Sequence, residues 1–455
     1  MDFQLLKYHI TPRVVKVGKK NTISIKGLDD SVRFYDDVEY LVGIFCADSW
    51  NYKEGKELYA SGRDMGEILS VFPKDGVITF TYSFIAEGEY EVKIERKDKE
   101  SDAHVPDRFI KYWKAGKNRI VNGFSFMIYA LENDLYGKKP YKGDLHVHSF
   151  ESDGFESPEF VAARYRTFGY DFMSLTDHYF MDSSFELVDK MQEVDSGLKV
   201  FPGEEVHPMR NGEVFHVVNF NGKSSVNALY NSNVNKAKSE INEIAKTIGL
   251  SSDVDNLEIA YFKWIFDKIR EAGGIAIYPH AFWHVGRSYN VRPSISDYII
   301  RNKLCDAYEI LGGMSKRDNR EMAQYAAELK ADGVDLPFVA SSDAHSSLKQ
   351  GSVHFGDAFT IAFSESLEQI PNAIMNKQAV AVDNFSVDDK TVYGNLRLVR
   401  YTYFLLEQYY AMHDELCNAT GQALLRYVLG DEKQKTLVET LDNERKKFDL
   451  DFFGM

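Results

Sequence analysis

The chain has 455 residues, of which 44% are hydrophobic and 27% charged, which is typical of a globular protein with a large core and two or three domains. Its formal net charge of −15 argues against non-specific binding to nucleic acid, because such binding depends on lysine and arginine meeting phosphates. The charge still permits a small anionic substrate in a local basic pocket.

The sequence also predicts the compartment. Residues 1–4 show no basic region followed by an apolar run, so we expect no signal peptide. No apolar segment approaches the roughly 18 residues that span a bilayer. Cys46, Cys305 and Cys417 are widely spaced and odd in number, which indicates buried thiols in a reducing compartment. We therefore expect a cytoplasmic protein without a membrane anchor.

Residues 1–138 are predicted to form an accessory β-sandwich, with an immunoglobulin-like arrangement as one option. Apolar and polar residues alternate at 76–84 and again at 89–95, the period of half-buried antiparallel strands. Further strands are expected at 21–25, 38–46 and 123–131, and a linker at 133–142. We favour a packing or oligomerisation role for this region over substrate binding.

From residue 142 to 385, strand-like runs alternate with helical ones, which predicts an α/β domain with a parallel sheet. The expected strands cover 145–149, 171–176, 199–201, 214–220, 275–278, 307–310, 337–340, 356–363 and 379–382. The expected helices cover 157–168, 185–194, 235–248, 257–272, 294–302, 318–331 and 365–376.

Residues 390–455 are predicted to form a helical extension. The stretch from 397 to 416 carries many aromatic residues, which usually pack against another domain or a sister subunit. Residues 431–448 mix acidic and basic side chains densely, as a solvated helix does. No chemistry is assigned to this region.

The candidate chemistry begins with His146 and His148. Residues two apart in a strand point to the same side, so both imidazoles would project together, as two ligands of one metal ion do. Asp153 follows in a Ser-Asp-Gly turn that can bring a carboxylate to the same place. A histidine pair alone is weak evidence, since many such pairs are ordinary strand residues.

More polar residues lie at or just past the ends of predicted strands: His178, Glu205, His280, Asp343 and His345. In a barrel of parallel strands those ends converge on one face, where active sites are built. Any one of these histidines alone is more often a satisfied core residue. Five polar residues at equivalent strand ends favour a shared site instead.

Together these motifs resemble the polymerase and histidinol phosphatase (PHP) superfamily of metal-dependent phosphoesterases. The matching pieces are Asp144-Leu-His-Val-His-Ser149, Ser152-Asp-Gly154, Thr176-Asp-His178, Gly203-Glu-Glu205, His216, His280 and Ser342-Asp-Ala-His345. The resemblance covers about residues 142–383. It implies a distorted (β/α)7 TIM-like barrel with two or three divalent ions at its mouth.

Carried over residue by residue, the resemblance implies three metal sites. His146, His148, Glu205 and Asp343 would hold one ion. Glu205 would bridge to a second ion, held also by His216 and His280. Asp153, His178 and His345 would hold a third. Imidazole and carboxylate together suit zinc, manganese or iron.

Some positions depart from the family pattern or are undecided by it. The pattern Gly-x-Glu favours Glu205 over Glu204, which would point away from the ions as a supporting residue. His207 and His284 match no family position, and Pro279 precedes His280 where the family usually has His-Pro. His284 is a candidate general acid or phosphate contact, with a surface or packing role as the alternative.

A phosphate needs cations beyond the metals, and two predicted mouth loops carry them. Arg287 and Arg292 follow His280, while Lys316, Arg317 and Arg320 follow the strand that ends at Leu311. Arginine suits bidentate phosphate recognition, although loop arginines are usually only solvated. The candidate catalytic residues are therefore His284, Arg287 and Arg317.

The sequence thus predicts a hydrolase of a phosphomonoester or phosphodiester, with a hydroxide shared by two ions as the nucleophile. Two alternatives stay open: the same centre hydrolysing an amide or glycoside, and a metal-stabilised scaffold without catalysis. The expected partner is a small phosphorylated substrate; a nucleotide or short oligonucleotide is the only nucleic acid expected. A homo-oligomer is compatible with the aromatic C-terminal region.

Overall fold

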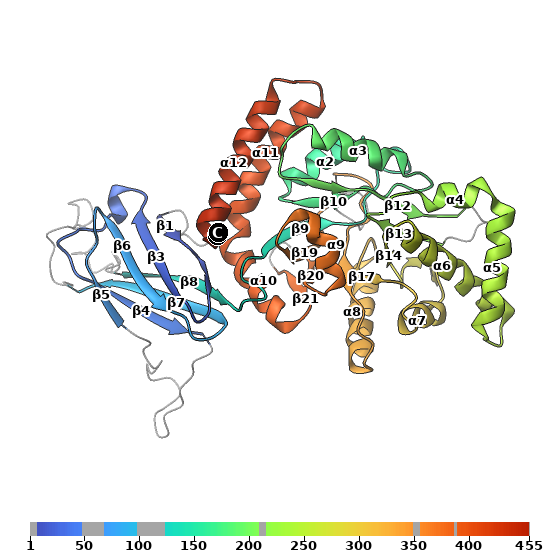
Figure 1. Cartoon of the computed structure of the whole chain (residues 1–455), viewed down its shortest axis with the longest axis horizontal. Coiled ribbons are helices and arrows are strands. Elements are labelled where there is room, and N and C mark those ends of the chain that lie inside the picture. The colour runs from blue at the N-terminus through green and yellow to red at the C-terminus, as the bar shows by residue number, and fades with distance from the viewer. Residues whose placement is uncertain are drawn as a thin grey trace. The chain divides into compact units, whose positions relative to one another are not determined.

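The computed structural model describes residues 7–47, 68–97, 123–208, 215–348, 355–385 and 389–454. Within these ranges the protein is of mixed α/β class (Figure 1). The chain groups into two compact units: Met1–Gly137, Arg400–His413 and Arg445–Met455 form unit 1, and Lys138–Val399 with Asp414–Glu444 forms unit 2. The three-part division expected from the sequence stays a prediction. Residues 1–4, which bear on the absence of a signal peptide, lie outside the described ranges.

Unit 1 contains two sheets around one core. The first has the order β1-β3-β6, with β1 Tyr8–Thr11, β3 Lys20–Gly27 and β6 Val77–Ser83. The second has the order β2-β8-β7-β4-β5, with β2 Val14–Lys16, β8 Gly123–Leu131, β7 Gly88–Arg96, β4 Tyr40–Cys46 and β5 Ile68–Val71. The pairs are antiparallel except for β2 with β8.

The alternating pattern places the unit 1 core as predicted. Tyr90, Val92 and Ile94 of β7 are buried, and so are Ile78 and Phe80 of β6. Both sheets contribute to the same buried cluster, so burial of one face of each sheet stabilises the pair. The short strands β1, β2 and β5 were not predicted, because three or four residues are too few to show a clear period.

Unit 2 also contains two large sheets. One has the order β11-β10-β9-β19-β20-β21, with β11 Lys199–Phe201, β10 Phe172–Ser174, β9 Lys139–Asp144, β19 Ala358–Ser364, β20 Ala379–Asp383 and β21 Thr391–Tyr393. The other has the order β12-β13-β14-β17-β18, with β12 Gly203–Val206, β13 Val217–Phe220, β14 Ile275–Tyr278, β17 Ala307–Leu311 and β18 Phe338–Ala340. Strand β18 also contacts β19 and β20, where the two sheets meet.

The expectation of a parallel sheet is only partly right. Strands β9, β10 and β11 are parallel, as are β14, β17 and β18. Strand β13 is antiparallel to both β12 and β14. Antiparallel pairing also joins β9 to β19, β19 to β20 and β20 to β21. The seven-stranded barrel stays a prediction.

Two predicted boundaries at the start of unit 2 are wrong. The expected linker contains most of β9, and the expected strand at 145–149 lies beyond its end. His146 and His148 therefore follow the strand, in extended backbone held by a single bridge between Val147 and Ala344. Residues 145–149 show no alternation of buried and exposed positions, because all five are buried.

Helix α2 of unit 2, Pro158–Thr167, begins after an N-cap serine and is followed by a glycine in the left-handed conformation, as helices commonly are. Ser157 caps α2, with Phe160 N donating to its side chain at 3.3 Å, and Gly169 follows the helix with a φ of 81°. The others are α3 Asp182–Gln192, α4 Val226–Ser232, α5 Val234–Ile248, α6 Asp253–Glu271, α7 Pro293–Arg301, α8 Lys316–Ala331 and α9 Ile370–Met375. The short helix α4 was not predicted.

Three C-terminal helices, α10 Leu396–Gln408, α11 Tyr410–Val428 and α12 Gln434–Phe453, are shared between the units. Within unit 1, the rings of Tyr401 and Phe404 lie 4.8 and 5.3 Å from that of Tyr129. These two aromatic residues thus pack on β8 within unit 1, whereas packing of the stripe against another domain or a sister subunit stays a prediction.

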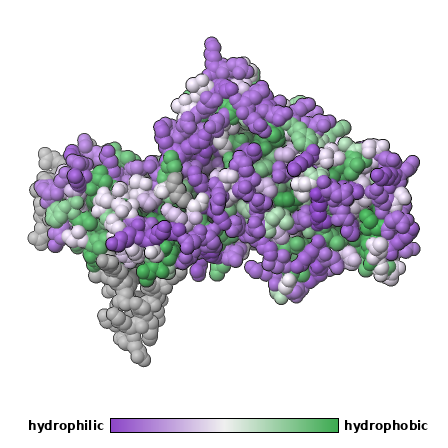
Figure 2. All heavy atoms as spheres, in the orientation of Figure 1, coloured by the Kyte–Doolittle hydropathy of each residue, from purple (hydrophilic) through white to green (hydrophobic). Residues whose placement is uncertain are grey.

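No helix among the described residues combines the length and hydropathy that crossing a bilayer requires. On the face drawn in Figure 2, apolar residues are interspersed among hydrophilic ones, as on an ordinary protein surface.

Candidate metal centre

Backbone hydrogen bonds bring four distant segments of unit 2 side by side. Segment 146–148 bonds to segment 343–345 through two bonds of 2.9 Å. On its other side, Thr176 N donates to the carbonyl of Val147 at 2.8 Å, and Glu205 N donates to Thr176 O at 3.0 Å. Side chains that lie up to about 200 residues apart in sequence therefore face one space.

The first group in that space consists of His146, His148, Glu205 and Asp343, all buried or nearly so. Nε2 of His146 lies 3.1 Å from Glu205 Oε2 and 3.3 Å from Asp343 Oδ1. Nε2 of His148 lies 3.3 Å and 3.1 Å from the same two oxygens. The members are those expected for the first ion.

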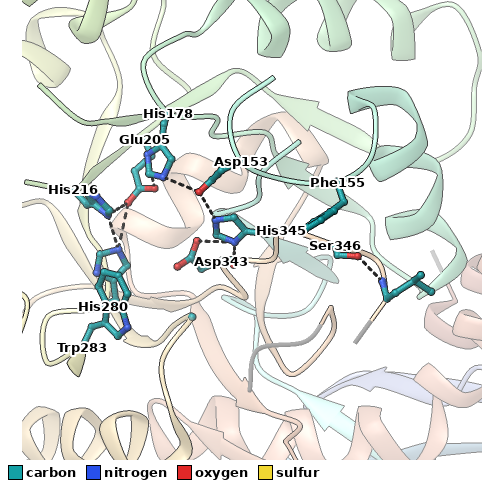
Figure 3. Close-up of a pocket in the computed structure, with 12 residues that line it drawn as sticks. Asp153, Phe155, His178, Glu205, His216, His280, Trp283, Asp343, His345 and Ser346 are labelled. Carbon is teal, nitrogen blue, oxygen red and sulfur yellow. Dashed lines mark hydrogen bonds and ion pairs between the residues drawn. The ribbon is translucent and has the colours of Figure 1, made fainter. Parts of the chain in front are cut away.

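The second group joins the first through Glu205. While Oε2 of Glu205 faces the first group, Oε1 lies 2.9 Å from His216 Nδ1 and 3.3 Å from His280 Nε2. Those two nitrogens are 3.3 Å apart. One carboxylate thus presents Oε1 to His216 and His280 (Figure 3) and Oε2 to other histidines, among them His178 Nδ1 at 3.3 Å.

The third group contains Asp153, His178 and His345, and the structure adds His148 to it. Asp153 Oδ2 lies 3.2 Å from His345 Nε2 and 3.8 Å from His178 Nε2. Asp153 is half exposed, so this group is the one most open to solvent. All nine residues predicted as ligands therefore gather in three adjoining groups.

The donor atoms fit metal ions better than they fit one another. Although carboxylate oxygens lie 3.1–3.3 Å from Nε2 of His146 and of His148, neither nitrogen has an oriented hydrogen-bond partner, and both are buried. Buried polar atoms are normally satisfied. Ligand atoms around an ion about 2.1 Å away lie about 3.0–3.5 Å from one another. The nitrogens and oxygens are thus spaced as ligands that converge on a common point.

Glu309 supports two of the histidines from behind. Its Oε1 accepts a hydrogen bond from His146 Nδ1 at 3.0 Å, and its Oε2 accepts one from His280 N at 3.2 Å. A carboxylate acceptor at Nδ1 selects the tautomer that leaves the lone pair on Nε2, which faces the first group. Glu309 is fully buried in β17.

Two aspartates hold the loops that carry the ligands. Asp144 Oδ1 accepts from His146 N at 3.2 Å and from Ser342 N at 3.0 Å, which ties two ligand segments together. Asp177 accepts from Ser149 N and Ser149 Oγ at 2.7 Å each, which shapes the loop that leads to Asp153. Burial raises the pKa of Asp144 to about 6.

Glu204 points away from the ligand groups, as expected. It is buried and accepts hydrogen bonds from Val226 N at 2.6 Å, Ser225 Oγ at 2.7 Å and Asn227 Nδ2 at 3.0 Å. Its carboxylate thus caps the N-terminus of α4. Successive residues of strand β12 point to opposite sides, so Glu204 stabilises the start of α4 while Glu205 faces the ligand groups.

The first group behaves as a tight acid–base cluster. Burial opposes protonation of His146, but the carboxylates of Asp343, Glu205 and Glu309 outweigh it and raise the pKa of the ring. For His148, burial is outweighed by the facing carboxylates of Asp343 and Glu205, and the pKa rises to about 10. Although burial opposes it, the facing histidines lower the pKa of Glu205. A divalent cation would replace these protons.

Two other histidines stay neutral. Burial lowers the pKa of His178 to about 4, and it lowers the pKa of His207 to about 4 as well, with nearby His216 adding to the effect. Neutral imidazole is the form that binds metals, because its free nitrogen keeps a lone pair.

The backbone is strained where two ligands sit. His280 has a φ of 32° and Asp343 a φ of 51°, a region that non-glycine residues seldom adopt. Gly313 packs so closely on Asp343 that a Cβ there would collide with that side chain. Tertiary contacts hold these ligands in place at a cost in local energy.

A cavity of about 480 Å³ opens over the three groups. It is lined by Asp153, Phe155, His178, Glu205, His216, His280, Trp283, Gly313, Asp343, His345, Ser346 and Leu348. Phe155 and Leu348 are largely exposed at its edge, and Trp283 lies under His280 (Figure 3). Among the lining residues that the structure describes there is no lysine or arginine.

The three candidate catalytic residues do not line this cavity. His284 is hydrogen-bonded through Nδ1 to Asp318 at 2.9 Å. Arg317 is exposed and donates to Glu321 at 2.9 Å. Arg287 is exposed in the turn between β15 His284–Val285 and β16 Ser288–Tyr289. Their catalytic roles stay predictions.

The sequence analysis missed Glu309, Asp177 and the placement of His207. A glutamate inside the apolar run Ala307–Leu311 was an available signal, since a buried carboxylate needs partners. His207 lies two residues after Glu205, and its ring is 4.6 Å from that of His216. Glu205 itself lies inside β12, not past a strand end, although it also bridges to His178.

Comparison with known proteins gives matches among solved structures only. No family model matches the chain, and no curated protein does. A two-domain protein from Bacteroides vulgatus, containing a predicted PHP-like metal-dependent phosphoesterase, is 17% identical with a TM-score of 0.37. That match covers 54% of this chain and 66% of the other.

Two further structures are similar over 47% of the chain. A candidate metal-dependent phosphoesterase from Bifidobacterium adolescentis is 16% identical over 92% of its own length, with a TM-score of 0.33. An amidohydrolase from Chromobacterium violaceum, with bound sulfate and no metal, is 17% identical over 90% of its length, with a TM-score of 0.32. PHP-like phosphoesterases are thus among the structures similar to this chain, as the motifs predict. At these identities and TM-scores, nothing about its substrate follows from them.

Proposed function

We propose that unit 2 is a metal-dependent hydrolase of phosphomonoesters or phosphodiesters. The observation that carries the proposal is Glu205: its Oε1 faces His216 and His280, and its Oε2 faces the separate set His146, His148 and His178, all at 2.9–3.3 Å. A carboxylate shared in this way is suited to two ions side by side. The distorted (β/α)7 barrel is part of the same proposal, supported by the contact of β18 with β19 and β20.

Each of the three groups would hold one ion. His146, His148 and Asp343 would hold the first ion, His216 and His280 the second, with Glu205 between them. Asp153, His178 and His345 would hold a third. Zinc, manganese or iron bound there would supply an activated water and neutralise charge that develops on phosphate oxygens.

The protein's own contribution is to orient and to shield. Glu309 holds the ring of His146 by a 3.0 Å hydrogen bond, so Nε2 of His146 faces Glu205 and Asp343 of the first group. Phe155, Trp283 and Leu348 place apolar surface at the cavity edge, which excludes water from a bound substrate and lowers the local dielectric. Asp153 and His345 are the most exposed of the nine proposed ligands, so they would be the first of them to meet a substrate.

A second candidate is hydrolysis of an amide or a glycoside by the same centre. It is favoured by one observation: the described residues that line the cavity include neither lysine nor arginine. A phosphate there would depend on the ions and imidazoles alone for charge compensation. A neutral substrate would place no such demand on the pocket.

The test is a substrate panel on protein loaded in turn with Zn²⁺, Mn²⁺ and Fe²⁺. We expect hydrolysis of a phosphomonoester or phosphodiester that falls at least about 100-fold in Glu205→Gln, which removes the shared charge. Glu243→Gln, at an exposed glutamate on α5, is the matched control. Activity only on amides or glycosides would establish the second candidate, and inactivity of every metal form on all panels would refute both.

A further inference from the structure

Three histidines form a triangle in which His178 and His216 also belong to the third and second groups, whereas His207 belongs to neither. The ring centres of His178, His207 and His216 lie 5.2, 4.6 and 5.1 Å apart. One nitrogen from each ring lies within 4.8 Å of the others. Three imidazoles around one ion have ring centres about 5 Å apart when each nitrogen is about 2.1 Å from the metal. The spacing matches that of a tris-imidazole site.

Each ring has a buried nitrogen without a hydrogen-bond partner. These are Nδ1 of His178, Nδ1 of His207 and Nε2 of His216, although Nδ1 of His178 also lies 3.3 Å from Glu205 Oε2. His216 directs Nδ1 toward Glu205 at 2.9 Å, so its Nε2 lies on the opposite side of the ring from the second group. Buried nitrogens of this kind are uncommon, because each costs free energy unless something binds it.

His207 is positioned by its surroundings. Its backbone N donates to Asn227 Oδ1 at 2.9 Å, and its ring stacks on that of Tyr179 at 4.9 Å. Tyr179 itself has a φ of 65°, so its backbone is held in an unfavourable region. The ring is thus held against the other two and away from bulk solvent, although His207 is only half-buried.

We propose that His178, His207 and His216 form a further cation site, specific for a borderline transition metal such as Zn²⁺ or Ni²⁺. The site borders the second and third groups and shares one histidine with each. Because a neutral imidazole has a single free lone pair, His178 and His216 would hold ions on both nitrogens as imidazolates, each releasing its remaining N–H proton to solvent. Its donors are all imidazole, whereas each of the other groups includes a carboxylate. Imidazole binds Zn²⁺ and Ni²⁺ well, while Mn²⁺ prefers carboxylate and water oxygens.

The experiment compares metal content in wild type, His207→Ala and His207→Gln. Each is stripped with chelator, equilibrated with Zn²⁺ or with Mn²⁺ and analysed by elemental mass spectrometry. We expect wild type to retain one more equivalent of Zn²⁺ per chain than either variant, and all three proteins to retain the same amount of Mn²⁺. His9→Ala, at an exposed histidine of unit 1, controls for adventitious binding.

Co²⁺ titration gives a second readout that does not depend on activity. The visible absorption of the last equivalent bound by wild type should be missing from both variants, whose folding circular dichroism verifies. Equal Zn²⁺ content in wild type and both folded variants overturns the inference. The inference rests on the proposed function's premise that metals bind here, but the two can fail separately. If the wild type binds no metal, both are refuted. If metal is lost in His146→Ala but not in His207→Ala, only the tris-imidazole site is refuted.

Discussion

The carboxylate behind a ligand histidine decides which nitrogen the ring presents. Glu309 contacts Nδ1 of His146 and the backbone N of His280, so it positions members of both the first and the second group. It does not itself face the cavity. A residue in this position acts through the histidines and not on the substrate.

Replacing Glu309 by Gln should weaken metal binding by about 10- to 100-fold, as changes behind ligand histidines do. The amide keeps the volume but removes the charge that favours the Nδ1–H tautomer. Competition with a chromogenic chelator measures the affinity. Glu243→Gln should leave it unchanged, and an unaltered affinity in Glu309→Gln would show that the contact plays no positioning role.

Buried His178 makes stability depend on pH in the metal-free protein. Its pKa is lowered by burial from 6.5 to about 4, so its contribution is fully present above pH 6.5 and is lost as the pH falls from 6.5 to 4. The gap corresponds to at most about 3 kcal/mol. Glutamine does not titrate, so the free energy of unfolding of His178→Gln should lack this decrease at low pH.

Urea unfolding in chelator at pH 7 and pH 4.5 measures the effect. The free energy of unfolding should fall more steeply with decreasing pH in wild type than in His178→Gln. Other groups titrate in both proteins, so the difference between the two isolates this ring. Parallel pH profiles would contradict the assigned burial of a neutral histidine.

At the scale of elements, strand β12 separates two neighbouring glutamates by function. Glu204 accepts hydrogen bonds at the start of α4, and Glu205 faces two sets of histidines. Glu204→Ala should therefore destabilise unit 2 by about 3 kcal/mol, because buried donors lose their acceptor. The folded fraction should keep its full metal content.

Glu205→Gln should show the reverse pattern. Its metal content should fall while the fold persists, because the side chain keeps its shape and loses only its charge. Thermal unfolding in chelator and elemental analysis of the folded fraction distinguish the two variants. Identical phenotypes for both substitutions would argue against opposite roles on the strand.

The loop between β9 and α2 supplies both a ligand and an apolar edge. Asp153 belongs to the third group, and Phe155 lines the cavity with 64% of its surface exposed. Phe155→Ala should raise KM about 3- to 10-fold for substrates with an aromatic leaving group, and little for a sugar phosphate. Phe150→Ala, an exposed phenylalanine of the same loop outside the cavity lining, is the matched control. Equal effects on both substrates would assign Phe155 a structural role.

At the scale of the whole molecule, metal binding should be coupled to the stability of unit 2. Ions that bind only the folded form stabilise it by about 2.7 kcal/mol when present at 100 times the Kd. Chelation should therefore lower the midpoint of unit 2 unfolding in calorimetry, and added metal should restore it. A midpoint independent of chelator would contradict metal binding to the folded chain.

Much of the site was predictable from sequence because its ligands belong to short patterns. His146, His148, Asp153, Asp343 and His345 lie in compact polar motifs within apolar surroundings, and this pattern predicts them as metal ligands. The strict alternation of β7 likewise predicted its buried face, since a period of two shows directly in the residues. These features depend on residues that are close together in the sequence, so the sequence alone predicts them.

Other features were decided by tertiary structure alone. Residues distant in sequence reveal their contacts only when backbone bonds join segments 146–148, 176–178, 205 and 343–345. For that reason Glu309 behind His146, the half-buried His207 beside His216, and Arg317 paired with Glu321 instead of lining the cavity were not foreseen. The residue types present were a property of the sequence; which of them meet was determined by how two sheets of mixed direction pack.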